Sequence, residues 1–172
     1  MEVDKGKSKR ILRDIKKIRQ EEAIIDVDVE TEKFVIYSLA GDLFAFKGHY
    51  VKEILIPTEI SYVPGSPDFL LGVINVRGDI ESVAALEKIL GLPTTKTSDK
   101  NRILLTEDRE IRSGILVESI EDVIDVPVDA INPPLATMTG PMADFLQGEM
   151  EYRGKNVMVL DVPKLFKRFI EI

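Results

Sequence analysis

At 172 residues the chain can form one or two small cores, and its 44% hydrophobic and 31% charged residues are typical of a soluble globular protein. The absence of cysteine excludes disulfides, thiolate metal sites and thiol catalysis. Residues 1–20 hold eight Lys/Arg against three Asp/Glu, whereas the remainder holds fifteen against twenty-seven, and so acidic a body argues against nucleic acid as the main partner.

The N-terminal segment, residues 1–32, is expected to be a basic arm. Within residues 9–25 aliphatic side chains recur at helical spacing opposite Lys and Arg, which predicts an amphipathic helix: Ile11, Ile15, Ile18 and Ile25. Three roles stay open for it: packing on the domain or on a second copy, contact with a membrane surface, or a tail that orders on binding. No apolar run has the length of a signal peptide or membrane span, so a cytoplasmic location is expected.

From Lys33 the hydrophobic period becomes that of β-strands. Residues 34–46 predict a hairpin that turns at residues 40–42, and residues 51–56 predict another strand. The apolar run 69–76 predicts a strand buried on both faces, in which Gly72 marks a bulge or a close approach of another backbone segment.

The dipeptide Arg77-Gly78 separates that strand from a second apolar-rich run, residues 80–86. Arg77 has two interpretations. It is either a solvated residue in a hairpin turn, or the polar anchor of a recognition surface, since arginine combines several donors with an apolar stem.

The second half contains a short helix ending at Gly91, a polar linker over residues 93–100 and further strands. Strands are expected at 102–108 and at 111–126 with a bend near Ser119, followed by a Pro-rich loop at 129–143, a hairpin turning at 153–155 and a closing helix from about Pro163. These two blocks of short strands favour an all-β protein with two small barrels.

No adequate active site is present in the sequence. Ser66 lacks the context of a nucleophile elbow, and phosphate- and dinucleotide-binding glycine motifs are absent. His49 has no companion ligand or base, so a surface position is expected. Glu121 and Asp125 fall on one face of their strand, as in a solvated acidic edge. The chain is therefore expected to be no enzyme and to hold no cofactor or metal.

The run V-P-G-S-P-D-F-L-L-G-V-I-N-V-R-G at residues 63–78 resembles the signature of the CheW-type coupling proteins of bacterial and archaeal chemotaxis. The resemblance extends from about Phe34 to Phe166 and leaves out the N-terminal arm. It implies two packed five-stranded SH3-like barrels over residues 33–172, with the halves at about 33–92 and 101–162, and it leaves open that some strands of one half contribute to the barrel of the other. An N-terminal amphipathic helix and a short C-terminal helix complete the expected fold.

The resemblance also implies a function: a non-enzymatic adaptor that couples the regulatory domain of a CheA-type histidine kinase to the hairpin tip of chemoreceptors, with membrane association only through those receptors. The family uses one surface for the kinase and a groove between the barrels for the receptor hairpin tip. The positions that match its partner-binding pattern are Arg77 as the anchor, Glu53 as a polar contact, and Val51, Gly72, Gly114 and Val123 as the groove and its support. For these last four positions a purely structural role stays open.

The chain departs from the family pattern beside the anchor. Ser82 stands where the family has Pro, and Ala85 where it has Asp. These departures keep a second function open, in which the chain is a CheW-like scaffold module of another two-component or regulatory pathway.

Overall fold

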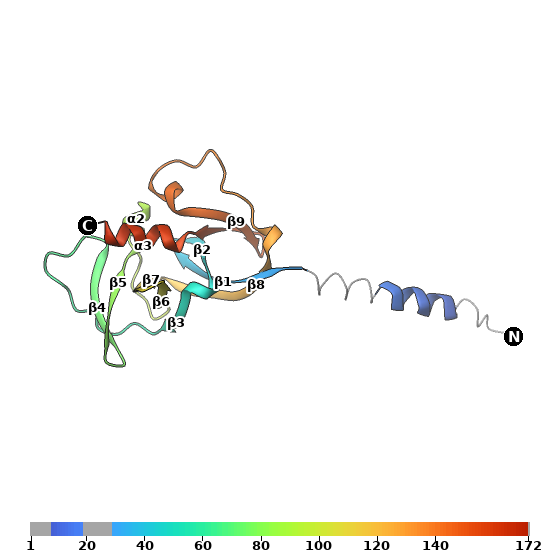
Figure 1. The fold of residues 1–172 in the computed structure, drawn as a ribbon, viewed down its shortest axis with the longest axis horizontal. Coiled ribbons are helices and arrows are strands. Elements are labelled where there is room, and N and C mark those ends of the chain that lie inside the picture. The colour runs from blue at the N-terminus through green and yellow to red at the C-terminus, as the bar shows by residue number, and fades with distance from the viewer. Residues whose placement is uncertain (1–7, 19–28, 172) are drawn as a thin grey trace. The chain divides into compact units, whose positions relative to one another are not determined.

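A computed structural model of the protein describes residues 8–18 and 29–171 (Figure 1). Residues 8–18 form an α-helix whose side chains are all exposed. The expected helix began at residue 9, and the rest of its predicted range, residues 19–25, lies outside the described residues. The chain from Glu32 onward forms a separate compact unit.

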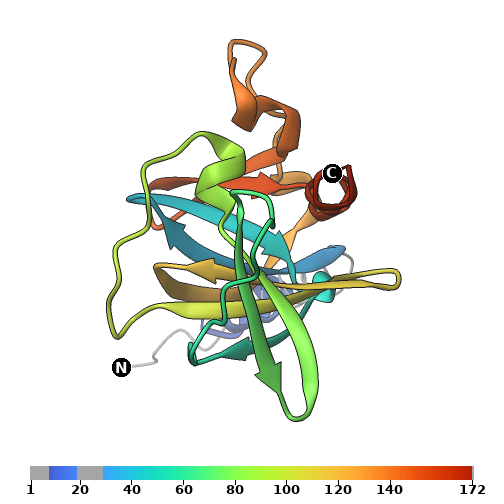
Figure 2. The same ribbon diagram turned by 90° about the vertical axis from the view of Figure 1, so that its left-hand side faces the viewer.

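This unit is built from two five-stranded sheets, and the described part of the chain confirms the expected all-β fold with two packed SH3-like barrels (Figures 1 and 2). The first sheet has the strand order β8 (Ser119–Pro127), β1 (Thr31–Leu39), β2 (Asp42–Lys47), β10 (Lys155–Leu160), β9 (Leu146–Tyr152). The second has the order β3 (Val51–Leu55), β6 (Arg102–Asp108), β7 (Ile111–Val117), β5 (Asp79–Ala84), β4 (Leu70–Val76).

The two sheets share strands between the expected halves, 33–92 and 101–162. The β1–β2 hairpin belongs to the first sheet because β2 pairs in parallel with β10, Leu43 opposite Val157. In the second sheet β5 pairs in parallel with β7, Val83 opposite Gly114. Each sheet therefore combines strands from both halves, and the contacts between the halves include a parallel pairing that no local turn encodes.

One apolar core joins the two sheets. Tyr37 and Phe46, from adjacent strands of the first sheet, have ring centroids 5.0 Å apart, and the same cluster includes Leu104 and Ile115 of the second sheet. Because side chains of both sheets share this cluster, each barrel buries apolar area against the other barrel. We therefore expect the stability of each barrel to depend on the other.

Two short helices in the described compact unit close this core. Helix α2 (Leu86–Leu90) ends at Gly91 in the left-handed conformation, as expected. Helix α3 (Val162–Ile170) begins at Asp161, whose carboxylate accepts a hydrogen bond from the backbone N–H of Lys164 at 3.0 Å. It buries Val162, Leu165 and Phe166 and confirms the expected closing helix.

Other segments differ in detail from the elements expected from the sequence. The strand expected at 111–126 breaks at residue 118 into β7 and β8, close to the predicted bend. The Pro-rich loop contains the 3₁₀ turns η2 (Val128–Ala130) and η3 (Pro141–Phe145), and η1 (Gly48–Tyr50) precedes β3. Strand β4 is not buried on both faces: Asn75 is exposed between buried Ile74 and Val76, because a strand of a barrel wall turns alternate side chains to solvent.

Candidate protein-binding surface

The turn between β4 and β5 presents Arg77 to solvent. Arg77 and Gly78 have φ values of 52° and 94°, and Val76 pairs with Asp79 around them. Two successive positive φ values are the mark of a tight hairpin turn whose twist matches the strands. The side-chain oxygen of Asn75 accepts a hydrogen bond from the N–H of Gly78 at 2.8 Å and fastens the turn. The hairpin projects from the barrel (Figure 2), and the side chain of Arg77 is 72% exposed.

Glu53 on β3 holds the Arg77 guanidinium in place. Arg77 Nη1 donates to Glu53 Oε1 at 2.9 Å, and Nη2 donates to Oε2. This two-pronged pair fixes the orientation of both side chains. The hydrogen bond and the positive charge of Arg77 lower the pKa of the Glu53 carboxyl, and the carboxylate in turn raises the pKa of Arg77. The family resemblance implied both residues as partner contacts, but it gave no sign that they bind each other.

Exposed apolar side chains lie on the chain segments that carry or adjoin this pair: β3, the segment that follows β3, and β5. They are Ile54, Ile56, Tyr62, Val63 and Ile80. Val51 differs from them: it is half-buried and packs against the core that joins the sheets. Arg77 and Glu53 thus form a polar pair in a region whose neighbouring chain segments carry exposed aliphatic and aromatic groups.

Gly72 acts through the backbone. It lies at the irregularity in the β4–β5 pairing with a φ of +148°. A Cβ at this position would lie 2.2 Å from the carbonyl oxygen of Ser61, whose backbone exchanges two hydrogen bonds with Val73 at 2.8 and 2.9 Å. The two sequence-based interpretations of Gly72, a bulge and a close backbone approach, are both confirmed.

Gly114 and Val123 lie elsewhere in the fold. Gly114 is buried on β7, where a Cβ would lie 2.7 Å from Ile103 Cγ2. Val123 is 46% exposed on β8, at the end of the first sheet. The structure therefore brings Arg77 and Glu53 into direct contact, places Gly72 and Gly114 inside the second sheet, and assigns Val123 to the other barrel.

The surface around Val123 is acidic, as predicted for this strand. Glu121 and Asp125 are exposed on β8. Asp122 between them accepts a hydrogen bond from the Tyr152 hydroxyl at 2.6 Å, which lowers the pKa of the Asp122 carboxyl and raises that of Tyr152. Lys33 lies 3.1 Å from Asp125. Glu121 accepts a hydrogen bond from the Ser119 hydroxyl at 2.6 Å, so all three carboxylates on this strand already have partners within the chain.

A further carboxylate with a structural role was missed by the sequence reasoning. Glu118, at the break between β7 and β8, accepts hydrogen bonds from the backbone N–H groups of Ala40 and Gly41 at 3.0 and 3.4 Å. It therefore fastens the turn of the β1–β2 hairpin to the β7–β8 corner. An acidic residue at a strand break is the only signal in the sequence that could have indicated this contact.

The two departures from the family pattern have structural consequences. The Ser82 hydroxyl lies 2.9 Å from that of buried Ser113, so the hydroxyl pair joins β5 to β7. Ala85 occupies the N-cap position of α2 with no side-chain hydrogen bond. An aspartate at that position is a good N-cap residue, so its replacement by alanine removes a capping group from α2.

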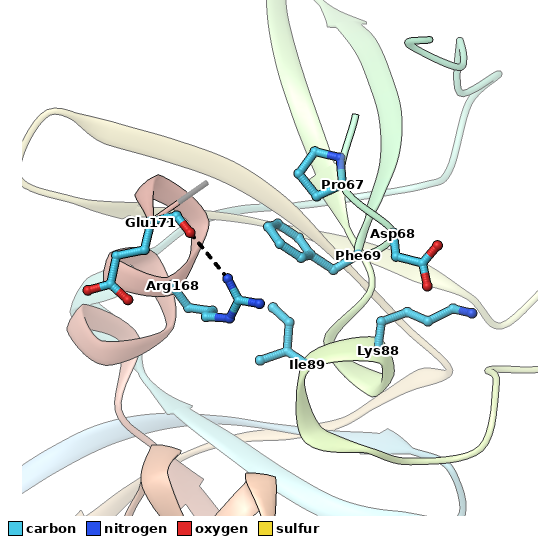
Figure 3. A pocket seen from close by; sticks show the side chains of 7 residues that line it. All are labelled: Pro67, Asp68, Phe69, Lys88, Ile89, Arg168 and Glu171. Carbon is cyan, nitrogen blue, oxygen red and sulfur yellow. Dashed lines mark hydrogen bonds between the residues drawn. The ribbon is translucent and has the colours of Figure 1, made fainter. Parts of the chain in front are cut away.

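A pocket of about 400 Å³ lies between the start of β4, α2 and α3 (Figure 3). Phe69 stacks on Phe169 with centroids 5.5 Å apart, and the Arg168 guanidinium lies 5.7 Å from the centre of the Phe69 ring. The pocket is lined by Pro67, Asp68, Phe69, Lys88, Ile89, Arg168 and Glu171. None of the six predicted site residues lines this pocket. Its lining contains two acidic and two basic side chains, so it favours neither an anionic nor a cationic ligand.

The described residues contain no group of three or more His, Cys, Asp or Glu side chains placed to hold a metal ion. His49 lies on the surface, as expected, with its Nδ1 3.8 Å from Glu32. Among the described residues no helix has the length and apolar character needed to cross a membrane.

Comparison with known proteins gives consistent matches. A family model described as the CheW-like domain matches residues 33–169. Chemotaxis protein CheW of Bacillus subtilis (strain 168) is 35% identical over 95 residues, which are 55% of this chain and 61% of that protein. Chemotaxis protein CheW of Treponema pallidum (strain Nichols) is 28% identical over 146 residues, 81% of this chain and 85% of that protein. The crystal structure of scaffolding protein TtCheW from Thermoanaerobacter tengcongensis is similar with a TM-score of 0.71 and 28% identity, covering 77% of this chain and 86% of that one.

Proposed function

The chain belongs to the CheW-like domain family of chemotaxis scaffold proteins, and on that premise we propose that it is a non-enzymatic adaptor that couples a CheA-type histidine kinase to methyl-accepting chemoreceptors. Its partners are then the regulatory domain of the kinase and the hairpin tip of the receptor. The adaptor works in the cytoplasm, and the receptors connect it to the membrane.

The observation that carries this proposal is the exposed Arg77–Glu53 pair. The guanidinium uses two of its five N–H donors on Glu53 and keeps the others for carboxylate or carbonyl oxygens of a partner. Because Glu53 already orients the side chain, a partner that binds it has less conformational entropy to remove. Arginine is enriched at the energetic centres of protein interfaces, and exposed Ile56 and Ile80 supply apolar area in the same region.

Coupling needs two separate surfaces, and in this proposal each barrel supplies one of them. The first surface comprises Arg77, Glu53 and the half-buried Val51 on the second sheet, with Gly72 holding the β4 backbone in its bulged path. The second is the surface around Val123 on β8 of the first sheet. In this proposal Gly114 supports the binding surfaces indirectly, through the close packing of β7 against its neighbours.

The departures at Ser82 on β5 and at Ala85 before α2 favour a second candidate function. Ser82 makes a hydroxyl contact that the family's proline could not make, and Ala85 leaves α2 without a capping side chain. Both follow the Arg77 hairpin closely in the chain. A scaffold module for another two-component or regulatory pathway would keep the fold and alter this hairpin and its support.

Reconstitution tests the proposal. A CheA-type kinase and receptor-containing membranes are combined with and without the chain, and the rate of kinase autophosphorylation is measured with and without receptor ligand. We expect receptor control of the kinase to depend on added chain. A kinase rate that is the same with and without the chain would contradict the coupling role, and would leave the second candidate function.

A further inference from the structure

The helix formed by residues 8–18 lies outside the matched family domain, which begins at residue 33. The family's known partners therefore give no account of it. Four aliphatic side chains of this helix are 45–60% exposed: Ile11, Leu12, Ile15 and Ile18. At about 100° per residue they fall within an arc of about 120°, so they form one apolar stripe along the helix.

The rest of the helix surface is strongly cationic. Five basic residues stand against one acidic residue, Asp14, in residues 8–18. The basic residues are Lys9, Arg10, Arg13, Lys16 and Lys17. The same geometry places all five on the side opposite the apolar stripe, where they form a continuous basic face.

Such a helix has the character of a segment that lies in a membrane interface with its basic face toward lipid headgroups. Eleven residues extend for only about 16 Å, about half the thickness of a bilayer core, so the helix cannot span it. The described part of the helix has no aromatic side chain, and four aliphatic groups alone form a weak anchor. Binding would therefore depend on attraction between the five cations and anionic headgroups.

The acidic surface of a second copy is the competing occupant for the helix, since the chain beyond residue 20 has an excess of carboxylates. The acidic strand β8 is less suited to that role, because Asp122 is hydrogen-bonded to Tyr152 and Asp125 lies 3.1 Å from Lys33. The phosphates of an anionic lipid surface are not already paired with basic side chains of a protein. Such a surface also needs no shape complementarity to accept an aliphatic stripe.

We propose that helix 8–18 binds the surface of an anionic phospholipid bilayer directly, with its aliphatic stripe inserted among the headgroups and its basic face paired with lipid phosphates. This contact is independent of the receptor-mediated membrane association of the proposed function, because it needs neither receptor nor kinase. It would let the adaptor reside at a membrane before its partners arrive.

The test is co-sedimentation of the full chain with receptor-free vesicles. One set of vesicles contains only phosphatidylcholine, and the other contains phosphatidylcholine with phosphatidylglycerol at a ratio of 7 to 3. We expect binding only to the anionic vesicles, and we expect it to weaken steeply as salt is raised, because the charges are exposed and screened.

Two variants with matched controls locate the contact. The double substitution Lys16→Glu/Lys17→Glu is expected to lower the partition coefficient at least about tenfold, whereas Lys100→Glu/Lys155→Glu, which makes the same charge change on the exposed surface of the compact unit, leaves most of the binding.

Ile15→Glu is likewise expected to abolish binding, while Leu135→Glu, at another exposed apolar position, retains it. All four sets of substitutions fall on exposed side chains, so the fold of the compact unit is not at risk.

Three results would overturn the proposal: equal binding to neutral and anionic vesicles, absence of binding to both, or equal loss in the helix variants and their controls. Sedimentation velocity without vesicles adds a direct check. Self-association that disappears in Ile15→Glu, in the absence of vesicle binding, would assign the helix to a second copy of the chain. The adaptor function is tested independently, because the kinase reconstitution measures autophosphorylation and not lipid binding.

Discussion

Replacing Arg77 by glutamate tests the candidate surface at its most defined point. The substitution removes both hydrogen bonds to Glu53 and places two carboxylates side by side at the tip of the β4–β5 hairpin. Since the Arg77 side chain is 72% exposed, water solvates the new charge and folding stability changes little. We expect the melting temperature to stay within about 2 °C of the original.

The effect on binding is expected to be much larger than the effect on stability. Removal of an arginine side chain from the centre of an interface weakens binding about fivefold to thirtyfold. Reversal of its charge adds repulsion from acidic partner atoms. The dissociation constant for at least one of the two proposed partners, the kinase regulatory domain or the receptor hairpin fragment, should therefore rise at least fivefold. Isothermal titration calorimetry with each partner measures it.

Arg153→Glu is the matched control. Arg153 precedes Gly154 in the β9–β10 turn, has a φ of 48° where Arg77 has 52°, and carries a side chain that is 80% exposed. It lies on the first sheet, 4.0 Å from Asp122 beside the second proposed surface, so we expect it not to weaken the partner that Arg77→Glu weakens. Equal binding by the Arg77→Glu variant and the original chain, or equal loss of the same partner in both variants, would refute the assignment of Arg77 as an anchor.

Three further changes test the structural account. Gly72→Ala should destabilise the fold by about 3 kcal/mol or more in urea titration, because the new Cβ would collide with the carbonyl oxygen of Ser61. The control is Gly65→Ala, which is also at positive φ but has open space around it, and it should cost about 1 kcal/mol. Tyr152→Phe should raise the pKa of Asp122, measured by carboxyl NMR titration. Because the pKa of Asp122 is lowered in the fold, its contribution to folding stability is present above the ordinary aspartate pKa and is lost as pH falls through its pKa in the folded protein. An Asp122 pKa that is the same in Tyr152→Phe as in the original chain would contradict the hydrogen bond. Asp161→Ala should cost about 1 kcal/mol by removing the N-cap of α3, and an unchanged urea midpoint would speak against that cap.

Features that depend on neighbours in the chain could be predicted from the sequence. The Gly72 bulge, the Gly91 helix end and the Arg77-Gly78 turn all follow from the limited φ range of side-chain-bearing residues and the freedom of glycine. The exposure of Arg77 follows as well, since a charged residue between two apolar strands is favoured at a turn. These local rules hold because each concerns a few adjacent residues.

Features that depend on distant pairing could not be predicted. The β1–β2 hairpin could have packed with either half of the chain, and the contacts of β1 with β8 and of β2 with β10 assign it to the first sheet. Glu53 and Arg77 are 24 residues apart and come from different strand pairs, so no local pattern brings them together. The expected burial of β4 on both faces failed for a related reason: a run of aliphatic residues does not reveal that the barrel wall leaves one face near solvent.

The central claim is that one chain binds a kinase and a receptor at the same time through separate barrels. Sedimentation velocity of the chain mixed with both the CheA-type regulatory domain and the receptor hairpin fragment measures this directly. We expect a species that contains all three components and sediments faster than either pairwise complex. Displacement of one partner by the other, or the absence of binding to either, would contradict it.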